Sequence, residues 1–445
     1  MQIKLSDHFT YGRLLRFTFP AMVMMVFTSL YGVVDGLFVT NFAGKSALAA
    51  INFVYPVLMI LATFGYMFGA GGSALVAKTL GEGKRKKANE LFSLFVYLCA
   101  LLGVVFAVLG FFLLRPLLLW LGAEGEMLEQ AVLYGNVLLV SLSFWNLQYL
   151  FQIFFVTAEK PKLGLYVTLL AGITNMALDA LFIAGFRWGL AGAAVATAIS
   201  QIVGGGIPLI YFFCKNTSLL RLGKTHFDGN ATWKATTNGL SELVSGVSGS
   251  LVGILYNTQL IRYAGEDGVA AYGIMMYVSM IFIGIFFGYA NGSAPVIGYH
   301  YGAQNHGELK NLLKRGVILN VSAAAGMLLV SEVLSKPLAV IFAGYDAALY
   351  TMTLNGFRIY AVSFLFSGMA IMGPSFFTAL NNGLVSAVIA FLRTVVFQVG
   401  CVLVLPIVWG IDGIWLSLVI AEALAALVAV AFLAGMRKHY LTKPF

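Results

Sequence analysis

The chain is a succession of long apolar runs separated by short polar breaks. No Asp, Glu, Lys or Arg falls between Lys45 and Lys78, between Glu90 and Arg115, or between Glu129 and Glu159. About 20 apolar residues suffice to cross a bilayer, and a segment in hydrocarbon must satisfy its own backbone hydrogen bonds. Runs this long therefore predict transmembrane helices and not the alternating ten-residue strands of a membrane barrel.

Twelve such helices are predicted, six before and six after a polar stretch. They cover roughly residues 14–40, 46–77, 88–114, 128–158, 162–186, 189–213, 235–262, 267–299, 309–334, 347–379, 384–408 and 411–435. The predicted fold is an all-α integral membrane protein with two pseudo-symmetric six-helix lobes. Residues 1–214 would form the N-lobe, residues 215–234 a cytoplasmic linker, and residues 235–445 the C-lobe.

The two halves of the chain repeat at an offset of 221 residues. Segment 42–50 aligns with 263–271, and segment 188–192 aligns with 409–413, where both copies begin with Trp-Gly. Because each copy holds an even number of predicted helices, both would enter the membrane from the same side. The sequence therefore predicts a parallel repeat related by an axis along the membrane normal.

The basic residues fix the expected orientation. With the N-terminus placed inside, 20 of the 27 Lys and Arg residues fall in inner segments and six in outer loops. Positive charge concentrates on the cytoplasmic side of membrane proteins, so both termini are expected in the cytoplasm. The same topology, together with anionic lipid, accounts for the net charge of +9 without nucleic acid.

Enzymatic chemistry is not visible in the sequence. The three cysteines are isolated from one another, which predicts neither a disulfide framework nor a metal site. The five histidines form no Ser/His/Asp or metal-ligand constellation. We therefore expect no enzyme and no cofactor.

Acidic residues inside predicted helices are the main functional candidates, because carboxylates in hydrocarbon are costly and usually face the bundle interior. Asp35 and Asp179 both lie a few residues before the outer end of their helices. Asn175 precedes Asp179 by four residues and so shares its helix face, and Thr197 lies at a similar depth in the next helix. The four side chains could converge in the N-lobe, or they could be hydrogen bonds between packed helices.

Oxygen ligands of this kind suit a hard cation such as Na⁺. Buried carboxylates also suit coupling to H⁺, and the sequence leaves both ions open. The second copy of the repeat lacks all four side chains; the aligned residues are Tyr256, Val396, Gly400 and Leu418. The cation site is therefore predicted in one lobe alone.

Three charged residues inside predicted helices of the C-lobe are further candidates. Glu242 would either contact a cationic substrate or sit near the interface in the first turns, where acids are favoured. Arg393 is expected to pair with polar groups or to reach the inner interface. Glu422 aligns with Gln201, and its role is left open.

Polar and adaptable side chains supply candidates for a substrate cavity. Asn146, Gln148, Tyr149 and Gln152 form a polar stripe on one helix, and Met275, Met280, Met369 and Met372 add soft apolar surface. Such walls suit varied amphipathic molecules. Taken singly, however, a methionine in such a helix more often faces lipid or packs between helices.

Four segments resemble the multidrug and toxic compound extrusion (MATE) family, in particular the bacterial branch with DinF- and MepA-type proteins. They are Val34-Asp35-Gly36-Leu37-Phe38-Val39, Asn175-Met176-Ala177-Leu178-Asp179, the stretch from Gly189 to Thr197, and Gly298-Tyr299-His300-Tyr301-Gly302-Ala303. The resemblance covers essentially the whole chain. It implies a V-shaped pair of lobes that alternate between inward-open and outward-open states.

The resemblance also implies a function. A transporter of this family exports amphipathic, often cationic, organic compounds as Na⁺ or H⁺ enters, across the bacterial cytoplasmic membrane. Carried over by position, the cation residues would be Asp35, Asn175, Asp179 and Thr197. Pro20 matches a proline at which the first helix bends in some relatives. We expect a monomer whose partners are small molecules, the coupling cation and lipid.

One feature departs from the pattern. Some relatives carry an acid on the tenth helix, with a glutamate on the seventh, as part of a C-lobe cation site. Here the tenth helix has no acid from Asn355 through Thr378, although Glu242 could keep the role of the seventh. Two alternatives to a multidrug exporter are a lipid-linked oligosaccharide flippase and a membrane sensor or scaffold. The flippase would need several basic residues in its cavity, of which this chain offers chiefly Arg393.

Overall fold

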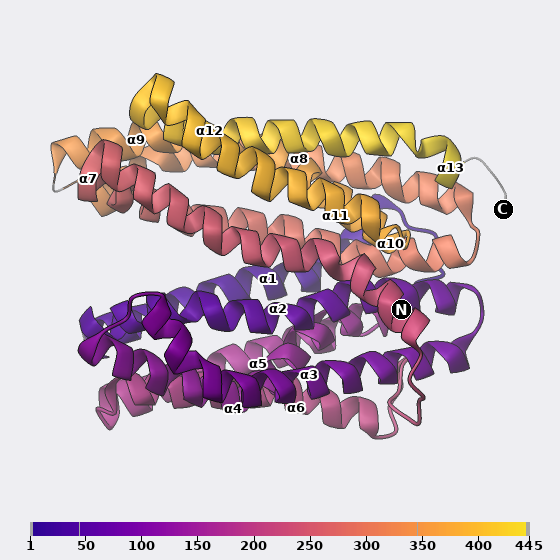
Figure 1. The fold of residues 1–445 in the computed structure, drawn as a ribbon. Coiled ribbons are helices and arrows are strands. Elements are labelled where there is room, and N and C mark those ends of the chain that lie inside the picture. Colours follow the sequence, from indigo (N-terminus) through magenta and orange to yellow (C-terminus); the bar gives the residue numbers. More distant parts are fainter. Residues whose placement is uncertain (1–2, 44, 345, 442–445) are drawn as a thin grey trace.

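All regular elements in the described part of the chain are helices (Figure 1). The structure, a computed structural model, describes residues 3–43, 45–344 and 346–441. The first half contains α1 (Tyr11–Phe38), η1 (Val39–Ala43), α2 (Lys45–Gly81), α3 (Arg85–Trp120), α4 (Gly125–Thr157), α5 (Pro161–Asp179), η2 (Ala180–Gly185) and α6 (Gly189–Phe213). The second contains α7 (Gly229–Gly302), α8 (His306–Ala343), α9 (Ala347–Ala361), α10 (Phe364–Ala379), α11 (Gly383–Phe391), η3 (Leu392–Gln398), α12 (Val399–Gly435) and α13 (Arg437–Leu441). The predicted all-α membrane fold is confirmed.

Fewer separate spans are found than the twelve predicted. Within the described residues, nine helices are long and apolar enough to cross a membrane, or ten if α9 and α10, bent by 44°, form one span. Two of these helices contain a glycine with non-helical backbone, Gly265 in α7 and Gly410 in α12. Each glycine lies where the sequence separates two predicted helices. Since α7 has 74 residues, far more than the roughly 20 that one crossing needs, the number twelve stays a prediction.

The sequence repeat is also a repeat of backbone conformation. Gly189 (φ 57°) and Gly410 (φ 56°) lie 221 positions apart, and so do Gly83 (φ 77°) and Gln304 (φ 52°). Positive φ is strained for most residues and open to glycine. The two halves therefore turn in the same way at equivalent points.

The long α7 begins at Gly229, six residues before the start predicted for this helix. The Asp228 carboxylate accepts a hydrogen bond of 3.0 Å from the backbone N–H of Ala231. A side-chain acceptor at this position satisfies an N–H that would otherwise have no partner in the first turn. This cap starts the helix inside the stretch that hydropathy alone assigns to the linker.

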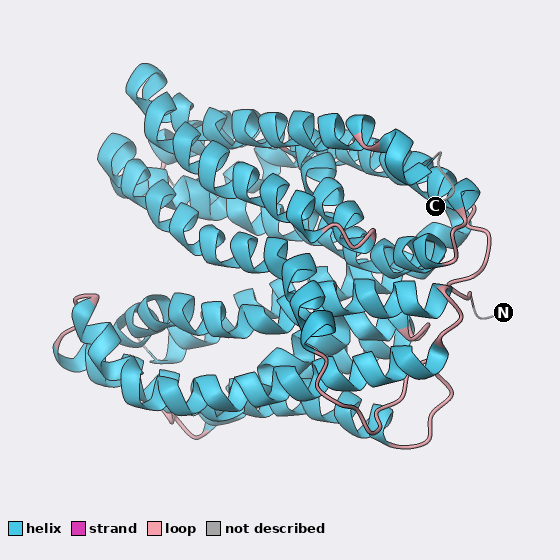
Figure 2. Cartoon of the chain, turned by 45° about the vertical axis from the view of Figure 1, so that its right-hand side comes forward, coloured by secondary structure: helices cyan, strands magenta, loops and turns pink. Residues whose placement is uncertain are grey.

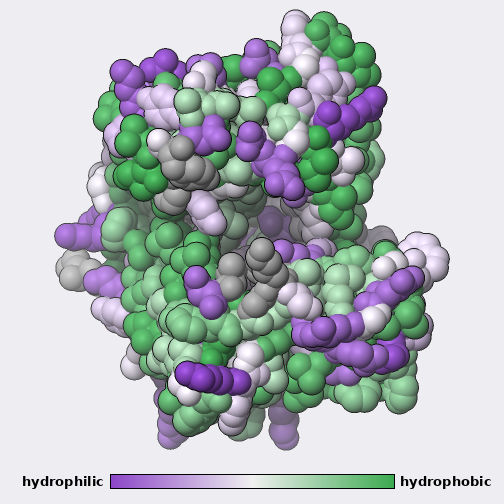
Figure 3. Space-filling view, turned by 90° about the vertical axis from the view of Figure 1, so that its left-hand side faces the viewer, coloured by the Kyte–Doolittle hydropathy of each residue, from purple (hydrophilic) through white to green (hydrophobic). Residues whose placement is uncertain are grey.

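Helices α1 to α6 form one bundle and α7 to α12 another, and the two diverge toward one end (Figures 1 and 2). Seen from that end, the surface is hollowed between the bundles (Figure 3). Both termini lie at the opposite end (Figure 2). Because the basic loops also lie there, we call it the inner end.

Near the inner end the backbones of α2 and α7 touch. A Cβ atom built on Gly71 of α2 would lie 2.5 Å from the backbone nitrogen of Gly239, and one built on Gly302 would lie 2.7 Å from the carbonyl carbon of Lys78. Small residues allow such close approach of membrane helices. The lobes are therefore closed against each other at the inner end and open at the other.

The segment before α1 links the two lobes across the inner end. The backbone N–H of Leu5 donates to the Glu159 carboxylate of the first bundle at 2.6 Å. The backbone N–H of Phe9 donates to the Glu308 carboxylate of the second bundle at 2.9 Å. Leu5 and Phe9 are fully buried, so this strap adds apolar contacts as well as hydrogen bonds to the closed end.

Candidate functional site

Two acids, the half-buried Asp35 and the fully buried Asp179, lie where an α-helix passes into a π-helical turn. Asp35 lies in the last turn of α1, directly before η1, and Asp179 is the last residue of α5, directly before η2. Short π-helical segments inside helices are rare overall, and those that occur are often found at functional sites. The helix ends thus carry both acids into the same region of the first bundle.

The structure brings the four predicted cation residues together. The carboxyl groups of Asp35 and Asp179 are close enough to interact electrostatically. The Asn175 amide donates a 3.4 Å hydrogen bond to the hydroxyl of Thr197 on α6. Asp179 is fully buried, and Asn175 is 1% exposed.

Most of the oxygen atoms in this cluster have no donor. Asp35 Oδ1, both carboxyl oxygens of Asp179 and Asn175 Oδ1 are buried without a hydrogen-bond partner among the described residues. Buried polar groups are normally satisfied, and an unpaired buried charge is far more costly. Two adjacent carboxylates in this setting repel each other when both are charged.

Tyr134 of α4 completes the cluster and was not predicted. Its side chain is 1% exposed, and it lies within hydrogen-bonding reach of Thr197 and close to both acids. Tyr134 is nine residues into an inward-running helix, as Thr197 is after Trp188. The distance of a polar residue from the outer end of its helix identifies Tyr134 when tyrosines are considered together with carboxylates and amides.

No group of three or more His, Cys, Asp or Glu side chains gathers as a metal site anywhere in the described ranges. The N-lobe cluster instead offers two carboxylates with neutral amide and hydroxyl oxygens. Oxygen donors of this kind suit a hard cation. The set has no sulfur or imidazole ligand and so does not resemble a zinc or copper site.

The equivalent place in the second bundle is filled by aromatic rings. Tyr256, which aligns with Asp35, is 2% exposed. Its ring stacks on Tyr272 at a centroid distance of 5.4 Å and an interplanar angle of 2°. The asymmetry of the sequence repeat is thus an asymmetry of packing as well.

The second bundle holds a buried ion pair of its own. Arg393 Nε, on η3, donates to both oxygens of Glu422 on α12, at 3.0 and 3.2 Å. The Gln398 amide donates to Glu422 Oε1 at 2.9 Å. Arg393 is the basic residue on which a flippase would chiefly depend for binding a phosphate group. Its guanidinium is instead paired with the Glu422 carboxylate. The pairing also gives Glu422 the role that the sequence left open.

Glu242 faces the boundary between the two lobes. This half-buried carboxylate on α7 interacts electrostatically with Arg393 in its own bundle and with Tyr66 of α2 across the boundary. The Tyr66 ring stacks on Tyr149 of α4 at 4.2 Å. Trp145 and Tyr55 continue this aromatic run at centroid distances of 6.2 and 6.0 Å.

The other polar candidates on α4 point into the first bundle. Gln148 and Gln152 line a cavity of about 10 Å³ between α4, α5 and α6. Asn146 is fully buried. Its amide oxygen accepts a 2.7 Å bond from the backbone N–H of Gly65, which ties α4 to α2. Of the predicted stripe, Tyr149 therefore lies nearest the lobe boundary.

The methionines and Pro20 are distributed widely. Met275 is fully buried in the core of the second bundle, Met369 and Met372 are 8% and 5% exposed, and Met280 is 41% exposed. Pro20 lies inside α1, which continues through it as one helix. Since proline has no N–H, the helix lacks one hydrogen bond at this point.

The chain is similar to known proteins in both sequence and structure. The model of the MatE family matches residues 20–181 and 244–403. The multidrug export protein MepA of Staphylococcus saprophyticus is 25% identical, over 94% of this chain and 92% of the relative. MepA of Staphylococcus aureus is 24% identical, with the same shares covered.

Solved structures of similar fold cover 98% of this chain and 98% of their own. A crystal structure of MATE in complex with MaL6 superposes with a TM-score of 0.92 at 23% identity. An outward-facing conformation of a multidrug resistance MATE family transporter superposes with a TM-score of 0.91, also at 23% identity. These two likenesses establish the fold.

Proposed function

Because the chain belongs to the MatE family, we propose that it exports amphipathic, often cationic, organic compounds in exchange for Na⁺ or H⁺. The exchange works by alternating access of the space between the two lobes. Relatives that are named multidrug export proteins over nearly the whole length of the chain support the export of drugs. The cluster around Asp35 and Asp179 supports the coupling.

The observation that carries the coupling is the set of unpartnered oxygens in one lobe. Asp35, Asn175 and Asp179 together present four buried oxygen atoms without a donor among the described residues. A Na⁺ ion or a proton held there neutralises two adjacent carboxylates. The cation thereby stabilises the conformation that keeps the two acids together, which is one with the lobes closed at the inner end.

Exchange then requires that the cation and the substrate favour different conformations of the lobes. A ligand shifts a conformational equilibrium only by its difference in affinity for the two states, and coupling of this kind is reciprocal. Cation binding in the N-lobe would oppose substrate binding between the lobes. Release of the cation inward would follow the change to the inward-open state.

Glu242 and the aromatic run are the proposed contacts of a cationic substrate. A cation over the face of Tyr or Trp is attracted by the ring, and a carboxylate opposite adds charge attraction. Tyr66 and Tyr149 belong to the first bundle and Glu242 to the second, so a bound molecule would touch both lobes. We place the transporter in the bacterial cytoplasmic membrane, as a monomer with both termini in the cytoplasm.

The test is transport of a fluorescent organic cation into and out of liposomes that contain the purified protein. One series imposes a Na⁺ gradient at fixed pH, and a second imposes a pH gradient without Na⁺. We expect wild-type transport to respond to one of these gradients. Asp35→Asn and Asp179→Asn should abolish that response, whereas Asp412→Asn, the same change at an exposed position of the outer end, should not.

The coupling proposal is wrong if both N-lobe variants still accumulate the dye against its gradient at the wild-type rate. Transport that responds to neither gradient in the wild-type protein would also refute it. Binding of the dye to Asp35→Asn is measured in parallel by fluorescence anisotropy. Retained binding without gradient-driven transport separates a lost coupling site from a misfolded protein.

A further inference from the structure

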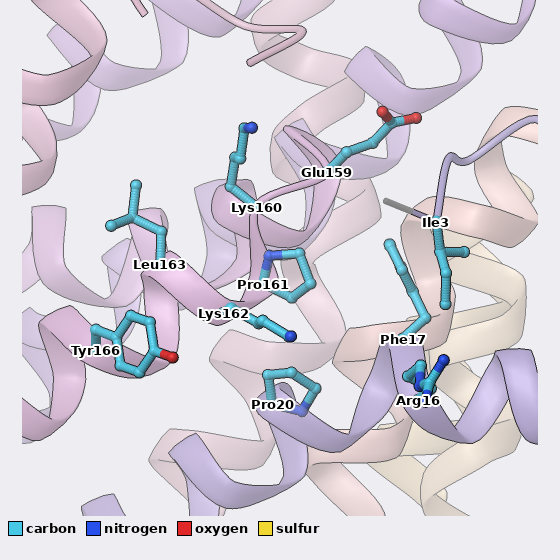
Figure 4. Close-up of a pocket in the computed structure, with 10 residues that line it drawn as sticks. All are labelled: Ile3, Arg16, Phe17, Pro20, Glu159, Lys160, Pro161, Lys162, Leu163 and Tyr166. Carbon is cyan, nitrogen blue, oxygen red and sulfur yellow. The ribbon is translucent and has the colours of Figure 1, made fainter. Parts of the chain in front are cut away.

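A cavity of about 490 Å³ opens at the inner end of the first bundle, outside the sites described above (Figure 4). It lies between the start of α1 and the start of α5. Its walls are partly apolar and partly basic. The apolar residues are Ile3, Phe17, Pro20, Pro161, Leu163 and Tyr166, and the charged residues are Arg16, Glu159, Lys160 and Lys162.

Three cations surround this cavity, and of these Lys160 interacts electrostatically with the neighbouring Glu159 carboxylate. The other two, Arg16 and Lys162, form no ion pair with any described residue. In Figure 4 the Lys162 ammonium extends toward Arg16, and the Tyr166 hydroxyl points to the same side. Lys160 and Glu159 are directed away from that space. The one acid on the wall, Glu159, accepts the N–H of Leu5 at 2.6 Å.

Large side chains at the cavity or next to one of its residues are exposed on the outer surface of the helices. Phe19, one residue before Pro20, is 61% exposed, and Tyr166 is 62% exposed. Large apolar side chains on the outer surface of membrane-spanning helices lie against acyl chains. The cavity is thus amphipathic, with basic groups at the level of the inner headgroups and an apolar wall that continues toward the bilayer core.

We propose that this cavity binds one anionic phospholipid of the inner leaflet. Its phosphate lies between Arg16 and Lys162, with the Tyr166 hydroxyl as a further donor, and one acyl chain follows Phe17 and Leu163. An arginine and a lysine suit a phosphate oxyanion, and basic pockets between membrane helices bind anionic headgroups. A free phosphate ion would leave the apolar wall uncovered, which favours lipid as the occupant.

The position gives the lipid a structural consequence. The cavity joins the inner part of α1, through Arg16, Phe17 and Pro20, to the loop that begins α5. It also reaches Ile3 in the strap that crosses to the second bundle. A bound lipid therefore holds α1 against its own bundle next to the proline where the helix lacks a hydrogen bond.

The test is native mass spectrometry of the full-length protein in detergent. A similar cavity of about 480 Å³ lies between α8 and α12 and has Lys310, Lys314 and Arg437 on its wall. All variants therefore carry Gln at these three positions. The probe is an equimolar mixture of phosphatidylglycerol and phosphatidylcholine with identical acyl chains. We expect the background protein to retain phosphatidylglycerol preferentially.

Each basic contact is expected to strengthen binding about fivefold, so Arg16→Gln with Lys162→Gln should lower the preference for phosphatidylglycerol roughly 25-fold. Lys86→Gln with Lys224→Gln removes the same charge from exposed positions outside the cavity and should leave the preference unchanged. Size-exclusion profiles confirm that both double variants remain folded.

Three results would overturn the proposal. The first is equal retention of the two lipids by the background protein, which would indicate an apolar groove alone. The second is displacement of the lipid by millimolar inorganic phosphate, which would indicate a site for the free anion. The third is an equal loss of preference in the two double variants, which would indicate surface charge without a site. Drug transport is not part of this readout, so the result is independent of the proposed function.

Discussion

The closed inner end depends on Gly71, and replacing this glycine by alanine should separate the lobes there. The added Cβ atom would lie 2.5 Å from the backbone nitrogen of Gly239, whereas carbon atoms in contact are about 3.5 Å or more apart. The neighbouring atoms are backbone and not the flexible tip of a side chain. The backbone carbonyl oxygen of Ala235 on α7 would lie closer still to the added Cβ, so α2 and α7 must move apart by more than about 1 Å.

The expected magnitude follows from the cost of overpacking, which is about 1–3 kcal/mol. Alanine is also a better helix former than glycine by up to about 1 kcal/mol. A second glycine-to-alanine change is therefore needed as a control for this gain in helix stability. Gly253→Ala on α7 supplies it, because nothing lies within 4 Å of the added Cβ. Relative to this control, Gly71→Ala should shift the ratio of inner-closed to inner-separated states by about 5- to 150-fold.

The assay is pulsed electron–electron double resonance, which measures the distance between spin labels placed at the inner end of the two bundles. Cysteines introduced at Lys86 of α3 and Lys310 of α8 occupy exposed positions. Cys99, Cys214 and Cys401 are replaced first, because all three are free thiols. We expect Gly71→Ala to add a population at longer distance that Gly253→Ala lacks. Identical distance distributions in the two variants would refute the idea that close backbone packing at Gly71 keeps the inner end closed.

Two further predictions concern stability and are measured by thermal unfolding in detergent. Glu422→Gln should lower the free energy of unfolding by about 3–5 kcal/mol, because the buried guanidinium of Arg393 loses the carboxylate that it directly contacts. Arg393→Met combined with Glu422→Met should cost much less, and equal losses in both proteins would contradict this account. Gly410→Ala and Gly189→Ala should each lower the free energy of unfolding by about 1–3 kcal/mol, since φ is 56° at Gly410 and 57° at Gly189 and alanine adopts positive φ only with strain. Gly400→Ala, with open space around it and ordinary helical φ, is the control and should change little.

Much of the N-lobe cluster could be predicted because helix periodicity and depth are visible in the sequence. Asn175 and Asp179 are four residues apart on one helix, and Asp35 and Thr197 lie at comparable distances from the outer ends of theirs. The polarity of these residues within apolar runs made them conspicuous. Tyr134 could not be singled out in the same way, because tyrosine is common in apolar helices.

Other features depend on information that hydropathy does not contain. Arg393 and Glu422 are 29 positions apart on different elements, so their pairing depends on the packing of η3 against α12. The π-helical turns η1 and η2 are changes of hydrogen-bond register, and apolar residues such as those in Ala180–Gly185 accept either register. Helices α7 and α12 each continue across a single glycine, at a point where the sequence predicts two separate helices. In each case the deciding fact is a backbone geometry or a contact between helices.

Helix α1 carries both a proposed cation ligand and part of the contact between the lobes. Asp35 lies in its last turn, and 13 positions earlier Met22 packs against the backbone at Gly288 of α7. At 1.5 Å per residue the two points are about 20 Å apart along one helix. In the proposed cycle, a change of charge at Asp35 shifts the outer part of α1 relative to α5. Pro20 lies between Met22 and the inner part of α1, and the helix lacks one hydrogen bond there. The inner part of α1 can therefore bend relative to Met22 without breaking further hydrogen bonds. The proposed cation site lies in the first bundle alone, and α1 of that bundle also contacts α7 of the second. Binding of the cation could therefore change the contact between the two lobes through α1.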